Sequence, residues 1–87
     1  MNVAHVLETH DRIVGFAIKV GHRVADSGIF VNALEPARRS GTFEWHLHVE
    51  SVGVSRVVEV PLPAGCDPYS PEAEAWCEAQ VRAACRP

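Results

Sequence analysis

The feature that most constrains how this chain folds is a run of alternating apolar and polar residues from Thr42 to Leu62. Successive side chains of a β-strand point to opposite faces, so the run predicts strands with one apolar face and one polar face. The chain turns at Val52 and Gly53, where glycine supplies the positive φ that tight hairpin turns usually need. A β-hairpin is therefore expected. Its apolar residues are Phe43, Trp45, Leu47 and Val49, then Val58, Val60 and Leu62.

The register of this hairpin follows from matching its two apolar faces. With Ser51 opposite Val54, Trp45 faces Val60, and the apolar sets of both strands coincide because directly opposite residues share a face. A slip of one residue would place Trp45 beside Glu59 and mix the faces. In the predicted register, His46 lies opposite Glu59. The other face then carries Glu44, His46, His48, Glu50, Val57 and Glu59.

The first forty residues predict further strands. Val3–Thr9 fits both a helical and a strand period, and a strand is favoured because His10 and Asp11 resemble a turn. Ile13–Val20 alternates apolar residues on one face and is predicted as a strand. Ile29–Leu34 is expected to pair back on it. This strand is expected to end at Glu35 and Pro36, because proline cannot donate to a ladder, with a loop over residues 37–41.

The C-terminal part predicts one amphipathic helix. Ser70 is placed to cap free backbone N–H groups, and Pro71 suits the first helical position, where no N–H is needed. Glu78 and Arg82 form an i,i+4 pair. The apolar stripe at helical spacing consists of Ala73, Trp76, Cys77, Val81, Ala84 and Cys85.

Together these elements predict an α+β fold in a single domain, residues 1–87. An antiparallel meander of four to five strands is expected to be packed by one C-terminal amphipathic helix in two layers. The helix must bury its stripe, and the sheet offers one apolar face. Trp45 and Trp76 are therefore both predicted to lie in the shared core.

Composition limits the classes of function. The formal net charge of −3 argues against nucleic acid and anionic membranes as partners. Cys66, Cys77 and Cys85 leave no complete pairing, so reduced thiols and a cytoplasmic location are expected. The N-terminus has neither a signal peptide nor a membrane span by pattern. The scarcity of lysine, with Lys19 the only one, suggests a bacterial or phage origin.

His46 and His48 give the sharpest candidate for chemistry. Their imidazoles project from one strand face about 6.6 Å apart, which suits two ligands of one metal ion. Glu59 is placed to be a third ligand or to orient His46. The competing interpretation is a solvated polar face with an ordinary cross-strand pair, and we expect no metal and no other cofactor.

An enzyme is the less favoured class. Cys66 lies just before the expected helix, where a thiolate could be stabilised, but no spacing brings it to a base. The phosphate-binding and dinucleotide-binding glycine motifs are absent from the sequence.

A nucleic-acid-binding or regulatory domain is the alternative. The order of three strands and a helix that opens SPEAEAW resembles the arm-type DNA-binding domains of phage-type integrases, over about the second half of the chain. Such domains read DNA with a basic sheet face. Here Glu44, Glu50 and Glu59 would repel phosphates, so no site is carried over.

The remaining class is a small non-enzymatic interaction protein. The face that bears Glu44, His46, His48, Glu50, Val57 and Glu59 is expected to contact a protein partner. Its carboxylates suit a basic surface, since complementary charge steers association. A homodimer is the second version of this hypothesis.

Overall fold

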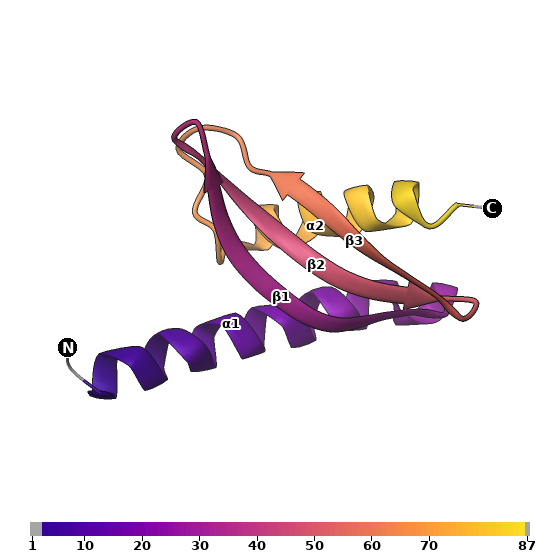
Figure 1. Cartoon of the computed structure of the whole chain (residues 1–87), viewed down its shortest axis with the longest axis horizontal. Helices are drawn as coiled ribbons and strands as arrows, with labels where there is room; N and C mark the ends of the chain where they lie inside the picture. The colour runs from indigo at the N-terminus through magenta and orange to yellow at the C-terminus, as the bar shows by residue number, and fades with distance from the viewer. Residues whose placement is uncertain (1–2, 87) are drawn as a thin grey trace.

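The computed structural model describes the backbone of residues 3–86 and the side chains of residues 9–86. Two helices lie against one face of a three-stranded antiparallel sheet, as Figure 1 shows. This confirms the α+β class and the two layers. The predicted four to five strands and single helix are wrong. The elements are α1 Val3–Val24, a short 3₁₀ turn Ala25–Ser27, β1 Ile29–Arg39, β2 Thr42–Ser51, β3 Val54–Pro61 and α2 Pro71–Ala84.

Helix α1 replaces both strands that were predicted before residue 21. Val3–Thr9 and Ile13–Val20 belong to one continuous helix of 22 residues. The side chains that enter the core are Phe16, Val20 and Val24, which are four residues apart and share one side of a helix. The period of two that predicted a strand arose because alternate apolar residues lie on opposite sides of α1.

Strand β1 continues beyond Pro36, where it was expected to end. It pairs with β2 as far as Arg39, and the predicted loop is reduced to a turn at Ser40 and Gly41. The sheet order is β1-β2-β3, so β1 is an edge strand. A proline is tolerated there because one side of an edge strand has no ladder to complete. A bulge between Val31 and Ala33 shifts the register.

The β2–β3 hairpin has the predicted register. Trp45 is paired with Val60, His46 with Glu59 and Ser51 with Val54. Trp45 is fully buried, as expected, and its indole Nε1 donates a hydrogen bond to the Pro68 carbonyl at 2.8 Å. Phe16 of α1 stacks on it with ring centroids 5.1 Å apart. The core therefore sits between β2 and the two helices.

Helix α2 begins as predicted and packs differently from the prediction. The Ala73 N–H donates to the Ser70 hydroxyl at 3.1 Å, which confirms the cap. Trp76 was predicted in the core but is 43% exposed. Its indole donates to the Pro61 carbonyl at 2.9 Å, so it covers the end of β3 from outside. The buried residues of α2 are Ala73, Cys77 and Val81.

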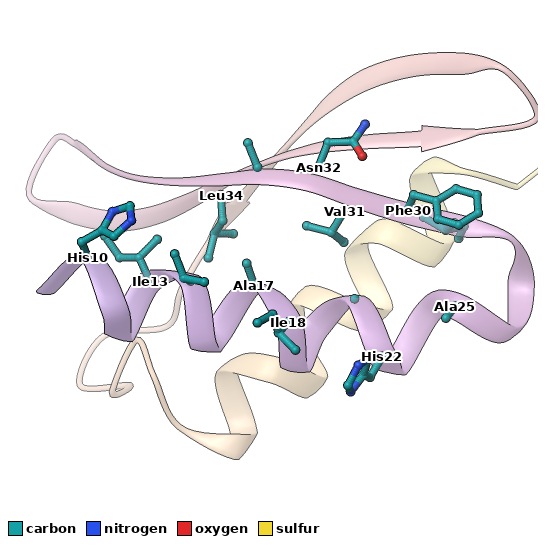
Figure 2. A pocket seen from close by; sticks show the side chains of 14 residues that line it. His10, Ile13, Ala17, Ile18, His22, Ala25, Phe30, Val31, Asn32 and Leu34 are labelled. Atoms are coloured by element: carbon teal, nitrogen blue, oxygen red, sulfur yellow. The ribbon is translucent and has the colours of Figure 1, made fainter. Parts of the chain in front are cut away.

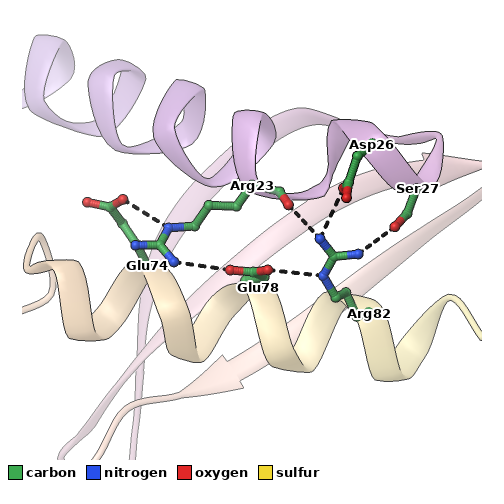
Figure 3. Close-up of polar contacts among 6 residues, drawn as sticks. All are labelled: Arg23, Asp26, Ser27, Glu74, Glu78 and Arg82. Atoms are coloured by element: carbon green, nitrogen blue, oxygen red, sulfur yellow. Dashed lines mark hydrogen bonds and ion pairs between the residues drawn. The ribbon is translucent and has the colours of Figure 1, made fainter.

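An ion-pair network joins the two helices at the opposite end of α1 from the N-terminus (Figure 3). Arg23 contacts Glu74 at 3.2 Å and Glu78 at 3.1 Å. Arg82 contacts Glu78 at 3.1 Å and Asp26 at 3.0 Å. Hydrogen bonds from Arg23 and then Arg82 lower the pKa of Glu78 below its ordinary value. The network fixes α2 beside α1. Among the described residues, no helix is both long and apolar enough to cross a membrane.

Candidate functional site

The six predicted site residues do share one face of the sheet, the face away from both described helices. We call Glu44, His46, His48, Glu50, Val57 and Glu59 the sheet strip. The register sets His46 opposite Glu59 and His48 opposite Val57. β1 adds Glu35, which lies opposite His46 on the same face. The structure therefore brings the strip together, but its two ends differ.

The end of the strip around Glu44 is buried and charge-compensated. Glu44 is only 5% exposed, although it lies on the face that was predicted to be polar. Its carboxylate lies 2.9 Å from His46 Nε2. The guanidinium of Arg39 lies 3.0 Å from Glu59 and 3.9 Å from Glu44. Arg39 reaches this position because β1 continues past Pro36.

Two of the three candidate metal ligands, His46 and Glu59, lie in this same cluster. Ligand atoms of Glu44, His46 and Glu59 lie within 4.8 Å of one another. His48, predicted as a ligand, instead pairs with Glu35 at 3.5 Å. A divalent ion at the triad would have to displace the Arg39 guanidinium from Glu59. The arrangement already has its counter-cation, and a compensated ion-pair cluster describes it without a metal.

The other end of the strip is open to solvent. The side chain of Glu35 is 66% exposed, and that of His48 is 43% exposed. Val57 is 54% exposed. Glu50 is half-buried and, among the described side chains, makes no ion pair. Carboxylates at this end are therefore available to a cation from another molecule.

The arginines do not gather into a basic surface in the part of the chain that the structure describes. Arg12 lies over the Tyr69 ring at 4.0 Å, and Arg38 lies over the Phe43 ring at 5.8 Å. Arg56 donates to the Ala84 carbonyl at 2.9 Å. Arg23 and Arg82 are held in the interhelical network. Phosphate binding would need such groups clustered and free on one face.

The cysteines show no catalytic arrangement. The Cys66 thiol contacts the Asp67 carbonyl at 3.6 Å and the Ser70 hydroxyl at 3.9 Å, and neither group is a base. Burial raises the pKa of Cys77 to about 12, so this thiol stays protonated and inert at neutral pH. Among the described residues, neither the Cys66 nor the Cys77 thiol is hydrogen-bonded to a base.

An apolar groove between α1 and β1 was missed by the sequence analysis (Figure 2). It has a volume of about 620 Å³. Val14 and Ile18 of α1 are 42% and 52% exposed beside it, and Phe30 of β1 is 61% exposed. The available signal was the spacing of four between Val14 and Ile18, which is helical.

Comparisons with known proteins give no further guidance. No family model, no curated protein and no solved structure matches this chain. The sheet strip and the apolar groove are therefore the two candidate surfaces for a function.

Proposed function

We propose that this chain is a small non-enzymatic interaction protein that binds a basic surface of a protein partner through the open end of the sheet strip. The carrying observation is the pair of carboxylates Glu35 and Glu50, on a sheet face that neither described helix covers. The only described arginine on that face, Arg39, is already bound to Glu59. The face therefore keeps an unbalanced negative charge.

The rigidity of this face supports the proposal. The strip lies mainly on the β2–β3 hairpin, whose opposite face is fixed by the buried Trp45 and Leu47. Carboxylates on a packed hairpin lose little conformational freedom when a partner binds, which reduces one cost of association. Complementary charges also raise the rate of encounter, and salt weakens that attraction. A partner with a basic surface would therefore bind this face at a low conformational cost and with a fast, salt-dependent encounter.

The test is affinity capture from the native host, followed by mass spectrometry. Wild type is compared with Glu35→Lys and Glu50→Lys, which reverse one exposed or half-buried carboxylate each. Glu72→Lys is the matched control, because Glu72 is exposed in the first turn of α2 and the net charge changes equally. We expect one partner, with a basic surface, to be retained by wild type and Glu72→Lys and lost from the other two.

Equal recovery of that partner by all four proteins would place its contact outside the strip. Capture that is insensitive to added salt would also contradict a contact made by exposed charges. Glu44 is unsuitable for this test, because substitution of a buried carboxylate also removes the partner of His46 and destabilises the fold.

A metal ion is the second candidate, favoured by one observation: the convergence of Glu44, His46 and Glu59 within 4.8 Å. If this cluster binds zinc, untagged protein contains it stoichiometrically, and His46→Ala loses it. Arg39→Ala would then bind zinc more tightly, because the competing guanidinium is gone. No zinc uptake by either wild type or Arg39→Ala would dismiss the metal.

A further inference from the structure

One aromatic ring of the chain, that of Phe30, has no structural role among the described residues. The other aromatic side chains do: Trp76 donates a hydrogen bond to the Pro61 carbonyl, and the rest pack ring against ring, namely Phe16, Phe43, Trp45 and Tyr69. Phe30 is 61% exposed, and no guanidinium of the described residues lies over its ring. An aromatic face is therefore open to another molecule.

Glu50 is the carboxylate of the sheet strip that has no partner among the described side chains. Glu44 lies 2.9 Å from the His46 imidazole, and Glu59 lies 3.0 Å from the Arg39 guanidinium. Glu50 makes no such contact, although it is half-buried. A carboxylate that has lost part of its hydration is stabilised by an opposite charge. Glu50 is therefore placed to accept a cation from outside the chain.

Phe30 and Glu50 lie directly opposite each other in the β1–β2 ladder. Such residues share a face of the sheet, with their Cβ atoms about 4.5–5.5 Å apart. The neighbours of Phe30 along β1, Ile29 and Val31, pack on the core, so Phe30 faces away from the helices. As a residue of the edge strand, it also borders the apolar groove. One cationic group from another molecule can thus contact the ring and the carboxylate together.

We propose that this pair binds an arginine side chain of the protein partner, with the guanidinium stacked on the Phe30 ring and paired with Glu50. The inference rests on the proposed function, because it names the group through which the partner binds. A planar guanidinium can stack on an aromatic face while the N–H groups at its rim donate to a carboxylate. The ammonium of lysine is a compact, strongly hydrated charge and gains less from the ring. The pair therefore selects arginine.

The chain itself makes contacts of this kind. The Arg12 guanidinium lies over the Tyr69 ring at 4.0 Å. Arg38 lies opposite Phe43 in the β1–β2 ladder, and its guanidinium is 5.8 Å from the centre of that ring. The proposed contact repeats this pairing at the other end of the two strands, with the arginine supplied by the partner. A methylated lysine would need a cage of several aromatic rings, and the register places only Phe30 on the uncovered face.

A shallow hollow beside Glu50 offers room for the chain that carries the arginine. Its volume is about 270 Å³, and Asn32, Ser55 and Val57 are among the residues that line it. Ser55 lies opposite Glu50 on the β3 side. The exposed Val57 offers apolar surface to an alkyl stem, and Asn32 and Ser55 offer hydrogen-bonding groups to a backbone. The site therefore extends from the ring across β2 to β3.

The test is a ¹H–¹⁵N NMR titration with a short arginine–glycine peptide and with the lysine–glycine peptide of the same length and charge. We expect both peptides to shift the Phe30 and Glu50 amides. The arginine peptide should bind about two- to fivefold more tightly, the range of an exposed cation–π contact. Phe30→Leu, which keeps an apolar side chain without a ring, should bind both peptides equally. Equal affinities in wild type, or an arginine preference that persists in Phe30→Leu, would overturn the proposal.

Two further variants separate the charge from the ring. Glu50→Gln should weaken both peptides, whereas Glu72→Gln, which removes the same charge from exposed α2, should bind like wild type. Affinity capture with Phe30→Leu then distinguishes this inference from the proposed function. A partner lost from Glu50→Lys yet fully retained by Phe30→Leu would overturn the arginine site and leave the proposed function in place. Capture that neither variant affects would contradict the proposed function itself.

Discussion

The two edge strands of the sheet, β1 and β3, are covered by the helices to different extents. At the β3 edge, α2 and β3 contact each other directly: the Trp76 indole of α2 donates to the Pro61 carbonyl at 2.9 Å, and the Arg56 guanidinium of β3 donates to the Ala84 carbonyl at 2.9 Å. At the β1 edge, α1 leaves Val14 and Ile18 exposed beside an open groove. Both edges belong to the same sheet and share the same core.

This difference shows that the exposed apolar groups are not simply a result of small size. The chain contains two tryptophans, and one of them closes the β3 edge from a position 43% exposed. The same two-layer architecture could have closed the β1 edge in the same way. Instead Val14 and Ile18 of α1 stay exposed there. The two edges therefore differ in how much of their apolar surface the described chain covers.

Replacement of Trp45 should have the largest effect, because this residue supports both edges. Trp45 is fully buried between α1 and the sheet. Trp45→Ala should lower the free energy of unfolding by about 3–5 kcal/mol, which approaches the whole stability of a small domain. Urea titration followed by circular dichroism measures this change. A free energy of unfolding within a few tenths of a kcal/mol of wild type would show that the core does not depend on Trp45.

The contrast between the edges is measured by Trp76→Ala and Phe30→Ala. Trp76 is half-covered and hydrogen-bonded, so its removal should cost about 2 kcal/mol. Phe30 is 61% exposed, so Phe30→Ala should lower the free energy of unfolding by less than about 0.5 kcal/mol. Denaturant titrations at low protein concentration compare the two. Equal costs would remove the distinction between a closed edge and an open one.

Loss of the N-terminal cap of α2 should have the next largest effect on stability. Ser70→Ala should lower the free energy of unfolding by about 1 kcal/mol, because the Ala73 N–H loses its acceptor. Ser70→Asp should be nearly neutral, since a carboxylate also accepts that bond and suits the helix dipole. Chemical denaturation of both variants gives the values. If Ser70→Ala unfolds like wild type, the closed edge does not depend on this cap.

The sequence predicted the closed side of the molecule better than the open side. The hairpin register and the Ser70 cap are local features, fixed by alternation over a few residues and by one side chain. Helix α1 was misread because alternate residues from Val14 to Val20 are apolar, although only Phe16 and Val20 of these are buried. Reading the same residues at a spacing of four separates the buried side of α1, with Phe16 and Val20, from its exposed side, with Val14 and Ile18. The groove could not be predicted, because it lies beside a helix in a segment that was predicted to form strands.

The candidate site was predicted in part for a related reason. The alternation placed all six strip residues on one face, which the register confirms. The burial of Glu44 was not predictable while β1 was expected to end at Pro36. Only the continuation of β1 brings Arg39 beside Glu44 and Glu59. Compensation of charge at one end of the strip thus depends on a long-range contact that no local pattern contains.

The interhelical network should give a small dependence of stability on pH. The folded-state pKa of Glu78 is lowered from its ordinary value of 4.5 by hydrogen bonds from Arg23 and Arg82. A lowered pKa means that the unfolded chain binds the proton more readily. The contribution of Glu78 is therefore complete above about pH 4.5 and lost as the pH falls through the lower, folded-state value. Thermal unfolding of wild type and Glu78→Gln measures it: the variant should lose less stability on acidification. An identical pH dependence would show that Glu78 contributes nothing to it.

The comparison of the two edges is tested most directly by two-dimensional ¹H–¹⁵N NMR of the wild-type protein titrated with ANS, a dye that binds exposed apolar surface. One experiment reports on both edges residue by residue. The account predicts dye-dependent shifts of the amides from His10 to His22 and of β1 around Phe30, with β3 and α2 unchanged. Shifts confined to β3 and α2, or spectra that the dye does not change, would contradict the account that uncovered apolar surface lies at the β1 edge.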